Sequence, residues 1–296
     1  MIRFLAALFL AAASQAAAAF SGSIVDAAFV AKAIARGAIV WDIRSTEAYF
    51  DGHLPGAVNA PVIQTLLDEK TQQFLPIERI DANLRAAGLD LKREIVVYGS
   101  PASAYAYFAQ FALEYFGARR VHVFHQGLPA WRAAKQKVST APVKPRPVKV
   151  RPFANPAMLV TTGEVLARIG SPGVQFLDVR RAGEFRGDES ETLHGGHIPG
   201  AIHIPYNDAL VDPDAPRKMM MKEAVDPSAT ALRKRRELKR LYASLDPRKE
   251  IIVYCHTGIR AAMTASVLAS LGFHSVRLYL ASWYEYGNQT DAPMEQ

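Results

Sequence analysis

The stretch "IIVYCHTGIRAAM" (Ile251 to Met263) holds the one cysteine of the 296-residue chain, Cys255. An apolar run comes first, a short polar loop with Gly258 follows, and a segment of small residues typical of a helix comes last. An apolar run without alternation is typical of a strand buried on both faces of a parallel sheet. The stretch therefore predicts a strand, a turn and a helix, with Cys255 at the carboxyl end of the strand, where such sheets bind their ligands.

The same pattern occurs twice in the chain. The segment "REIVVYGS" (93–100) matches "KEIIVYCHTG" (249–258), and "IVWDIRSTEAYFDGHLPGAVNAP" (39–61) matches "QFLDVRRAGEFRGDESETLHGGHIPGAIHIP" (175–205). Both longer segments carry Asp-x-Arg after an apolar run and then Gly-His-(Leu/Ile)-Pro-Gly-Ala. A repeat of this length indicates two copies of one domain in tandem.

Short Val/Ile-rich runs alternate with helix-like segments in each copy. This alternation predicts the α/β class, in which each copy has a mainly parallel central sheet flanked by helices on both faces. The clearest expected helices are 102–116 and 261–271. The expected strands are 39–41, 95–98 and 121–124 in the first copy, and 174–177, 251–254 and 276–279 in the second.

The segment between the two copies is rich in proline, with prolines at positions 142, 145, 147, 152 and 156. This density disfavours helix and sheet interior and favours an extended, semi-rigid connector. We therefore expect an N-terminal domain at 20–137, a Pro-rich linker at 138–157 and a C-terminal domain at 158–296.

The first residues, "MIRFLAALFLAAASQAAAAF", combine one arginine, an apolar centre and a run of small residues. This pattern predicts a signal peptide at 1–19 that is cleaved after Ala19. A membrane anchor needs about 20 strongly apolar residues, and the apolar centre here is shorter. We expect an exported protein, periplasmic or secreted, with no stable membrane insertion after cleavage.

Charge and cysteine content narrow the function classes. The formal net charge of +7 favours anionic partners, but the basic residues are scattered along the chain, so we expect no nucleic acid partner. The one basic cluster, "LRKRRELKRLY" (232–242), predicts a solvated helix or, alternatively, a docking surface for an acidic partner. A lone cysteine closes no intramolecular disulfide. Cys255 is therefore a free thiol in an oxidising compartment, for which a chemical role is the simplest reason.

The loop after the strand suits a thiolate. Its backbone N–H groups and the positive end of the following helix favour negative charge on Cys255. Gly258 allows the loop to turn its amides inward, and Arg260 adds a permanent positive charge. These features make Cys255 the candidate nucleophile. The alternative is that Cys255 is a small buried apolar side chain, as free cysteines often are.

The tandem repeat, the Gly-His-(Leu/Ile)-Pro-Gly-Ala motifs, the loop "CHTGIR" (255–260) and the closing "SWYEY" (282–286) resemble the rhodanese sulfurtransferase family, of the two-domain thiosulfate or 3-mercaptopyruvate type. The resemblance implies tandem rhodanese-like domains. It also implies that the second copy moves sulfane sulfur from a small anionic donor to cyanide or a thiol, with a protein acceptor also compatible. The sulfur is carried as a persulfide on Cys255, without a cofactor. The first copy is inactive, because Gly99 stands where the cysteine would be.

The resemblance also assigns residues around Cys255. The persulfide-binding loop comprises His256, Thr257, Gly258, Ile259, Arg260 and Ala261. Two-domain members place an arginine where this chain has Glu184, so the sulfur donor stays open, and Arg186 is a candidate replacement. Arg180 and His53 are further candidates for substrate contact, while Asp178 and Glu184 are expected as structural support.

Two alternatives to small-molecule sulfur transfer stay open. Glu184 and the basic cluster are compatible with a non-catalytic sulfur carrier or partner-binding module. The related phosphatases and arsenate reductases resemble Cys-x5-Arg, a loop one residue longer than "CHTGIR", so that activity ranks lower. No metal site is expected, because the spacing of His194, His197 and His203 matches no standard ligand pattern.

Overall fold

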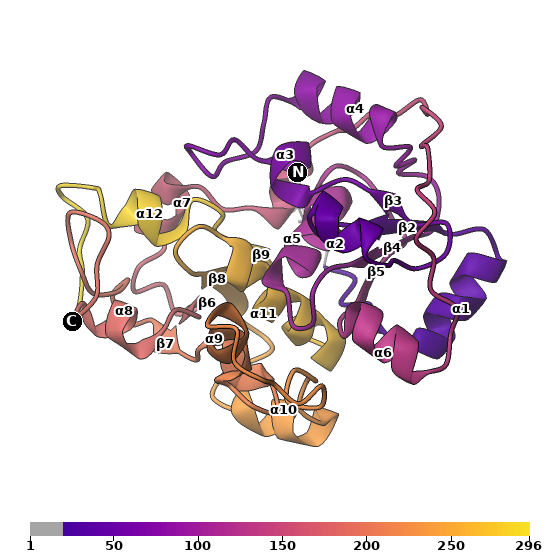
Figure 1. The fold of residues 1–296 in the computed structure, drawn as a ribbon. Helices are drawn as coiled ribbons and strands as arrows, with labels where there is room; N and C mark the ends of the chain where they lie inside the picture. The colour runs from indigo at the N-terminus through magenta and orange to yellow at the C-terminus, as the bar shows by residue number, and fades with distance from the viewer. Residues whose placement is uncertain (1–19) are drawn as a thin grey trace, which may run out of the picture.

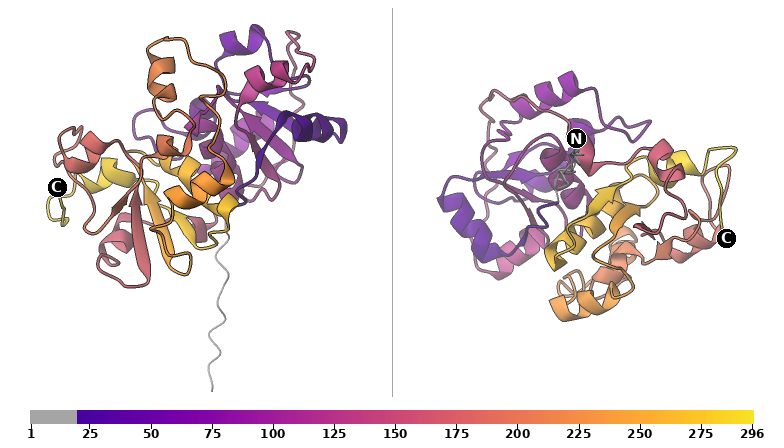
Figure 2. Two further views of the ribbon diagram at one scale, coloured as in Figure 1. Left: turned by 90° about the horizontal axis from the view of Figure 1, so that it is seen from below. Right: turned by 180° about the vertical axis from the view of Figure 1, so that it is seen from behind.

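The computed structural model describes residues 20–296, and the expected signal peptide at 1–19 lies outside the described residues. The chain forms two α/β domains that lie side by side (Figures 1 and 2). Within residues 20–296, no helix has the length and apolar character needed to cross a bilayer.

The first domain contains a five-stranded sheet in the order β1-β5-β4-β2-β3, and all of its strand pairs are parallel. The central strand β4 is fully buried along its length, because apolar side chains cover both faces of the sheet. Helices α1, α2 and α6 cover one face, and α3, α4 and α5 cover the other. The strands are β1 (Ile24–Val25), β2 (Ile39–Asp42), β3 (Val58–Asn59), β4 (Ile95–Tyr98) and β5 (Val121–Phe124). The helices are α1 (Ala27–Ala35), α2 (Thr46–Phe50), α3 (Val62–Leu66), α4 (Ile77–Ala86), α5 (Ala104–Tyr115) and α6 (Gly127–Ala133).

The second domain repeats this plan with a parallel sheet in the order β7-β6-β8-β9. Leu159 forms a parallel bridge to Leu278 of β9, in the place that β1 takes beside β5. The strands are β6 (Val174–Asp178), β7 (Ile202–His203), β8 (Glu250–Tyr254) and β9 (Val276–Leu278). The helices are α7 (Thr162–Leu166), α8 (Ala182–Arg186), α9 (Ala215–Met220), α10 (Arg235–Leu241), α11 (Ile259–Leu271) and α12 (Ser282–Tyr286), with short 3₁₀ turns η1 (Pro156–Met158) and η2 (Tyr206–Ala209).

The predicted α/β class with two tandem parallel-sheet domains is confirmed. The duplication extends to buried polar contacts at the carboxyl ends of the strands in both sheets. In each copy the Asp-x-Arg arginine bonds a backbone carbonyl of the turn that carries the histidine, and a tyrosine hydroxyl at the end of the central strand accepts a backbone N–H. These pairs are Arg44 with Gly52 (2.8 Å), Arg180 with Gly196 (2.6 Å), Tyr98 with Leu54 (3.2 Å) and Tyr254 with Ile198 (3.2 Å).

The proline-rich connector contains no helix before η1 and lies along the first domain. His53 and Ser139 exchange two backbone hydrogen bonds of 2.8 and 2.9 Å, and the Phe153 N–H donates to the Phe116 carbonyl at 3.3 Å. These bonds tie the connector to the domain that precedes it.

Helices α5 and α11 pack against each other at the boundary between the domains (Figure 1). Gln110 of α5 accepts a buried hydrogen bond from the Ser266 hydroxyl of α11 at 3.0 Å, and its own amide donates to the Val121 carbonyl at 3.0 Å. One apolar core runs through both helices into both sheets. The two domains therefore share a core rather than only a surface contact.

Candidate active site

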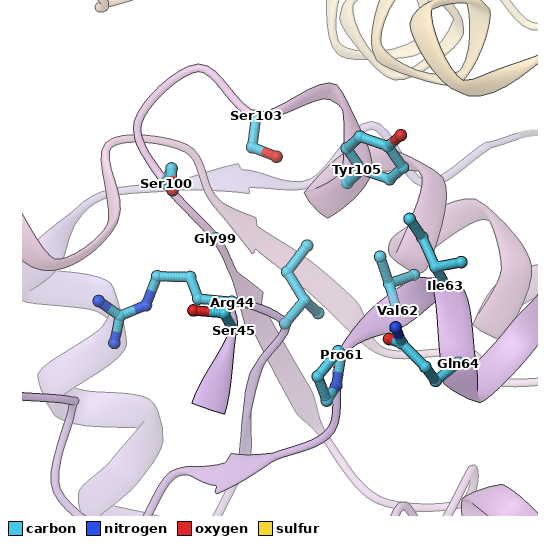
Figure 3. Close-up of a pocket in the computed structure, with 11 residues that line it drawn as sticks. Arg44, Ser45, Pro61, Val62, Ile63, Gln64, Gly99, Ser100, Ser103 and Tyr105 are labelled. Carbon is cyan, nitrogen blue, oxygen red and sulfur yellow. The ribbon is translucent and has the colours of Figure 1, made fainter. Parts of the chain in front are cut away.

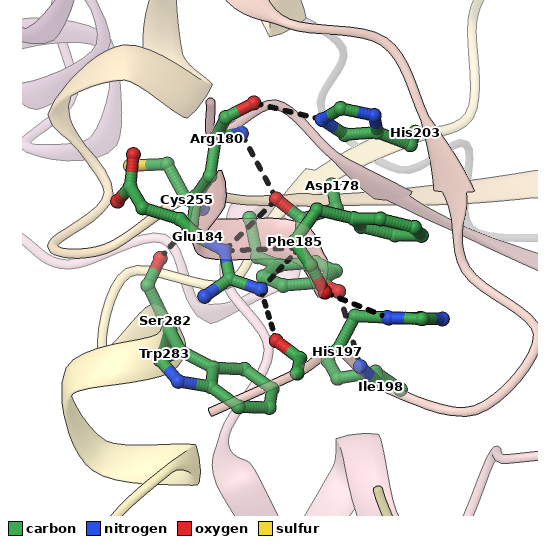
Figure 4. Close-up of polar contacts among 12 residues, drawn as sticks. Asp178, Arg180, Glu184, Phe185, His197, Ile198, His203, Cys255, Ser282 and Trp283 are labelled. Atoms are coloured by element: carbon green, nitrogen blue, oxygen red, sulfur yellow. Dashed lines mark hydrogen bonds and ion pairs between the residues drawn. The ribbon is translucent and has the colours of Figure 1, made fainter. Parts of the chain in front are cut away.

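Cys255 follows the last residue of β8 and is buried, with 1% of its surface exposed. Its N–H donates to the Ser282 hydroxyl at 3.1 Å, and that hydroxyl donates to the Tyr279 carbonyl at 2.6 Å. The Cys255 carbonyl accepts the Trp283 N–H at 3.0 Å. The start of α12 therefore fixes the backbone at the cysteine from both sides (Figure 4).

The loop between Cys255 and α11 depends on a left-handed glycine. Gly258 has φ of +81°, and an added Cβ would lie 2.6 Å from Leu280 Cδ1 and 2.9 Å from the Leu280 carbonyl oxygen. A side chain fits neither the backbone angle nor the space. The loop can therefore turn into the first residue of α11, Ile259, only with glycine at this position.

The amides of this loop are left without acceptors. Backbone N–H groups from His256 through Ala261 donate to no acceptor within residues 20–296. In the first copy two amides of the corresponding loop are bonded: Ala102 N–H donates to the His125 carbonyl after β5, and Ser103 N–H donates to the Ser100 carbonyl within the loop. Free amides at the start of a helix form an anion-binding environment. Within residues 20–296, the second copy therefore offers more free loop amides than the first.

The Arg260 side chain is paired with the carboxylate of Glu184. It forms two hydrogen bonds of 2.7 Å with the two carboxylate oxygens of Glu184, and both side chains are mostly buried. Burial raises the pKa of Glu184, but the hydrogen bonds and charge of Arg260 outweigh it and hold the pKa at about 2. Burial disfavours the charge on Arg260, while Glu184 and negative charge at Cys255 favour it, so its pKa lies above the ordinary value. Both groups are charged at neutral pH.

Asp178 and Arg180 form a second pair that is almost completely buried. Arg180 Nη2 lies 2.6 Å from Asp178 Oδ2, and the Arg180 guanidinium stacks 4.3 Å from the Trp283 ring centroid (Figure 4). The same guanidinium bonds the Gly196 carbonyl. The pair joins β6, the histidine turn and α12 beneath the loop.

A pocket of about 570 Å³ opens beside the loop. Tyr105 of the first domain and Met220 of α9 contribute to its wall. Its charged lining is balanced, with three arginines and three glutamates: Arg180, Arg181, Arg260, Glu184, Glu189 and Glu191. Every arginine of the lining is already paired with a carboxylate. A small anion therefore meets no unpaired guanidinium in this pocket.

His256 lines the same pocket, with its Nε2 3.5 Å from the Glu191 carboxylate. Burial lowers the pKa of His256 and outweighs the opposite effect of Glu191. The imidazole is therefore neutral at neutral pH. Thr257 and Ile259 line a neighbouring cavity, and Ala261 is buried within α11.

Two sequence-predicted substrate contacts lie elsewhere. Arg186 is exposed, pairs with Asp188 at 2.8 Å and does not line the pocket. Glu184 and Arg186 are two positions apart on α8, which places them about 200° apart around the helix axis, so Arg186 cannot replace an arginine at 184. Arg181, at the start of α8, reaches the pocket instead.

His53 is fully buried in the first domain and lines no pocket described here. Its ring stacks on Tyr49 with a centroid distance of 3.7 Å. Its two nitrogens lie 2.8 and 3.1 Å from the carbonyl oxygens of Tyr49 and Ala141. His53 therefore fixes its turn to the connector, and the expected substrate contact is corrected accordingly.

Several lining or supporting residues were not predicted from the sequence, among them Ser282, Tyr105 and Met220. Ser282 is the first residue of the closing motif "SWYEY", so this motif could have indicated its contact with Cys255. Tyr105 and Met220 reach the site only through tertiary packing. Within residues 20–296, no group of three or more His, Cys, Asp or Glu side chains is arranged to hold a metal ion.

The first copy has no thiol at the corresponding position and little room for one. A Cβ on Gly99 would lie 3.2 Å from the Ile43 side chain and 3.3 Å from Ser103 Cβ. Gly127 takes the place of Ser282 with a similar left-handed backbone, and a Cβ there would lie 2.4 Å from the Gly99 carbonyl oxygen. This geometry excludes the serine contact that supports Cys255.

Comparison with known proteins gives a consistent set of relatives. The rhodanese-like domain model matches residues 26–134 and 161–289. The thiosulfate sulfurtransferase of Corynebacterium glutamicum is 36% identical over 261 residues, covering 83% of this chain and 81% of the relative. The thiosulfate sulfurtransferase of Azotobacter vinelandii is 29% identical, covering 87% and 90%.

Solved structures share the fold. SseA from Escherichia coli, described as a 3-mercaptopyruvate sulfotransferase, superposes with a TM-score of 0.74 at 24% identity and covers 88% of this chain and 98% of its own. The anaerobic ergothioneine biosynthesis enzyme from Chlorobium limicola, in complex with trimethyl histidine, gives a TM-score of 0.77 at 21% identity, with coverage of 93% and 70%.

Proposed function

Since this chain belongs to the rhodanese family and is a sulfurtransferase, we propose that it moves sulfane sulfur from thiosulfate or 3-mercaptopyruvate to a thiol or cyanide through a persulfide on Cys255. The main support is the position of Cys255 at the start of a loop in which the N–H groups of the next six residues have no acceptor in the described part of the chain. The second domain is the catalytic one in this proposal, and the first domain is inactive.

The reaction has two half-reactions on one sulfur atom. The Cys255 thiolate attacks the outer sulfur of thiosulfate, the S–S bond of the donor breaks, and sulfite leaves with the electron pair. With 3-mercaptopyruvate the C–S bond breaks, and the thiol hydrogen ends on the methyl carbon of pyruvate. Cyanide or an acceptor thiolate then attacks the outer sulfur of the persulfide, and the Cys255 thiolate returns.

The residues around Cys255 act by position and charge. The free amides of residues 256–261 and the start of α11 suit the negative charge of a thiolate or persulfide. Ser282 holds the cysteine backbone, so the loop does not reorganise as the persulfide forms. No cofactor has a step in this scheme.

The test measures both half-reactions separately. The protein is incubated with each donor, and intact-mass measurement is expected to show an increase of one sulfur atom on Cys255. Thiocyanate release is then measured after cyanide is added. Cys255→Ser is expected to abolish both signals; full thiocyanate production by that variant would refute the mechanism.

A second candidate function is a sulfur carrier that works with a protein partner. The balanced charges of the pocket support it, because they offer little attraction to small anions. Exposed side chains at Met220 (76%) and Leu193 (70%) also support it, because they suit a protein surface. This candidate predicts that the persulfide forms but that turnover with small donors is negligible. Rapid turnover with thiosulfate alone would exclude it.

We also propose that the protein is exported. The support is the N-terminal sequence of residues 1–19. Fractionation of a Gram-negative expression host and N-terminal sequencing of the mature chain test this proposal, with Phe20 expected as the first residue. An unprocessed chain that begins at Met1 and stays in the cytoplasm would contradict it.

A further inference from the structure

The inactive copy retains a cavity at the same end of its sheet. This cavity, of about 300 Å³, lies beside Gly99 at the carboxyl ends of the first-domain strands (Figure 3). Apolar side chains of Ile43, Val62 and Ile63 line it, and Pro61 and Tyr105 complete the apolar part. A cavity of this size falls at the lower end of the range for small-molecule sites.

The cavity offers no free charge to a ligand. Arg44 is the one charged residue in its lining. Its guanidinium is already bound to the buried carboxylate of Asp42, at 2.6 Å, and to the Gly52 carbonyl, at 2.8 Å. The loop amides of Ala102 and Ser103 are also occupied. With its one charged side chain paired and these two amides occupied, the cavity favours an uncharged group.

A second cavity lies between this cavity and the catalytic loop. Ser100, Ser103 and Tyr105 of the first-domain cavity also line this second cavity, of about 400 Å³, on the domain boundary. Thr257, Ile259 and Arg260 of the catalytic loop are on the other wall of that second cavity.

Tyr105 of the first domain lines the cavities of both domains. It also lines the second cavity, so one side chain borders all three spaces. Burial raises the pKa of Tyr105, and negative charge at Cys255 raises it further, which is consistent with a phenol close to the thiolate. The three adjoining spaces share this side chain, and we call them together the boundary groove.

We propose that the boundary groove binds the sulfur acceptor, and that this acceptor is a thiol with an uncharged aliphatic or aromatic body. The body lies in the first-domain cavity, and the sulfur reaches the persulfide at Cys255. Its thiolate attacks the outer sulfur, the S–S bond to Cys255 breaks, and the acceptor leaves as a persulfide. This inference rests on the proposed function, because it assigns the acceptor of the same reaction.

The test compares acceptors that differ only in their bodies. The wild-type protein is expected to use 2-phenylethanethiol with a KM about tenfold lower than that of ethanethiol, since the ring buries additional apolar surface. 2-Phenylethanol, which has the body but no sulfur, is expected to compete with 2-phenylethanethiol and not with cyanide. Equal KM values for the two thiols would overturn the proposal.

Two variants test whether the first-domain cavity causes the lower KM for 2-phenylethanethiol. Ile63→Arg introduces a charge into the lining, and Ser103→Phe fills the space; Ser103 makes no capping hydrogen bond to α5 that the change would remove. Each is expected to raise the KM for 2-phenylethanethiol about tenfold while the rate with cyanide stays unchanged. Ile77→Arg is the matched control, because Ile77 is 38% exposed on α4 and lies outside the groove.

The outcomes separate this inference from the proposed function. If no persulfide forms on Cys255, the proposed function fails before the acceptor is tested. If the persulfide forms and cyanide is used but the two variants behave like Ile77→Arg, the acceptor site is refuted. A parallel loss with cyanide and both thiols would also refute it, because it would show a general defect.

Discussion

Glu184→Gln tests whether a single carboxylate determines which sulfur donor the site accepts. The substitution keeps the size of the side chain and removes the charge that pairs with Arg260 at 2.7 Å. Glu184, with its pKa held at about 2, is ionised throughout the neutral range. Thiosulfate carries two negative charges at neutral pH and 3-mercaptopyruvate carries one. The carboxylate therefore repels thiosulfate about twice as strongly.

The magnitude follows from Coulomb's law. For a donor charge about 8 Å from the Glu184 carboxylate and an effective dielectric constant of about 20 to 40, each unit of negative charge costs roughly 1–2 kcal/mol. The second charge of thiosulfate carries this cost again. Removal of the carboxylate is expected to raise the ratio of kcat/KM for thiosulfate to kcat/KM for 3-mercaptopyruvate about 5- to 30-fold.

The assay measures thiocyanate formation with both donors at one fixed ionic strength. The ratio of the two kcat/KM values is the readout, because a loss of folded protein cancels in it. Glu189→Gln is the control: Glu189 is 55% exposed and contacts only Arg181 among the arginines of the pocket, so we expect less than about a twofold change. The charge argument is refuted if the ratio stays constant in Glu184→Gln, or if Glu189→Gln raises it equally.

Three further predictions concern stability. Gly258→Ala is expected to lower the free energy of unfolding by about 2–4 kcal/mol, since alanine meets both a left-handed backbone and Leu280, and an unchanged denaturant midpoint would contradict this. Asp178→Asn leaves Arg180 buried without a counter-charge and is expected to cost about 3–5 kcal/mol by thermal or urea unfolding; a loss below about 1 kcal/mol would show that the pair is not stabilising. The lowered pKa of Glu184 contributes stability that is present above its ordinary pKa near 4.5 and is lost as the pH falls towards about 2. Unfolding measured across that window is expected to lose about 3 kcal/mol more in the wild type than in Glu184→Gln, and parallel curves would refute the assignment.

Sequence patterns predicted most of the strands and helices whose formation depends on nearby residues. The strands β4 and β5 begin and end at the predicted residues, because both are short segments rich in Val or Ile that are largely buried. The helix predicted at 261–271 begins earlier, at Ile259, because the left-handed Gly258 caps it. The two-residue strand β1 was not predicted, since its pairing with β5 depends on residues about 100 positions away.

The candidate site could be predicted only where it is local in sequence. The loop from Cys255 to Arg260 is one contiguous segment, and the spatial position of its residues follows from the strand, turn and helix. The contacts of Tyr105 and Glu184 with this loop depend on packing between distant segments. Arg186 is a poor substitute for a different reason, because residues two positions apart lie on different sides of a helix.

The packing of α5 against α11 gives the first copy a structural role that does not depend on a thiol at position 99. Residues from Ile259 through Leu268 on α11 are buried, apart from Arg260, and part of their cover belongs to the other domain. Removal of the first domain would expose apolar side chains of α11, the helix that follows Cys255. The two halves are thus the covalent counterpart of a heterodimer that buries one shared core. The first half, without a cysteine at position 99, supplies part of the wall of the pocket beside Cys255.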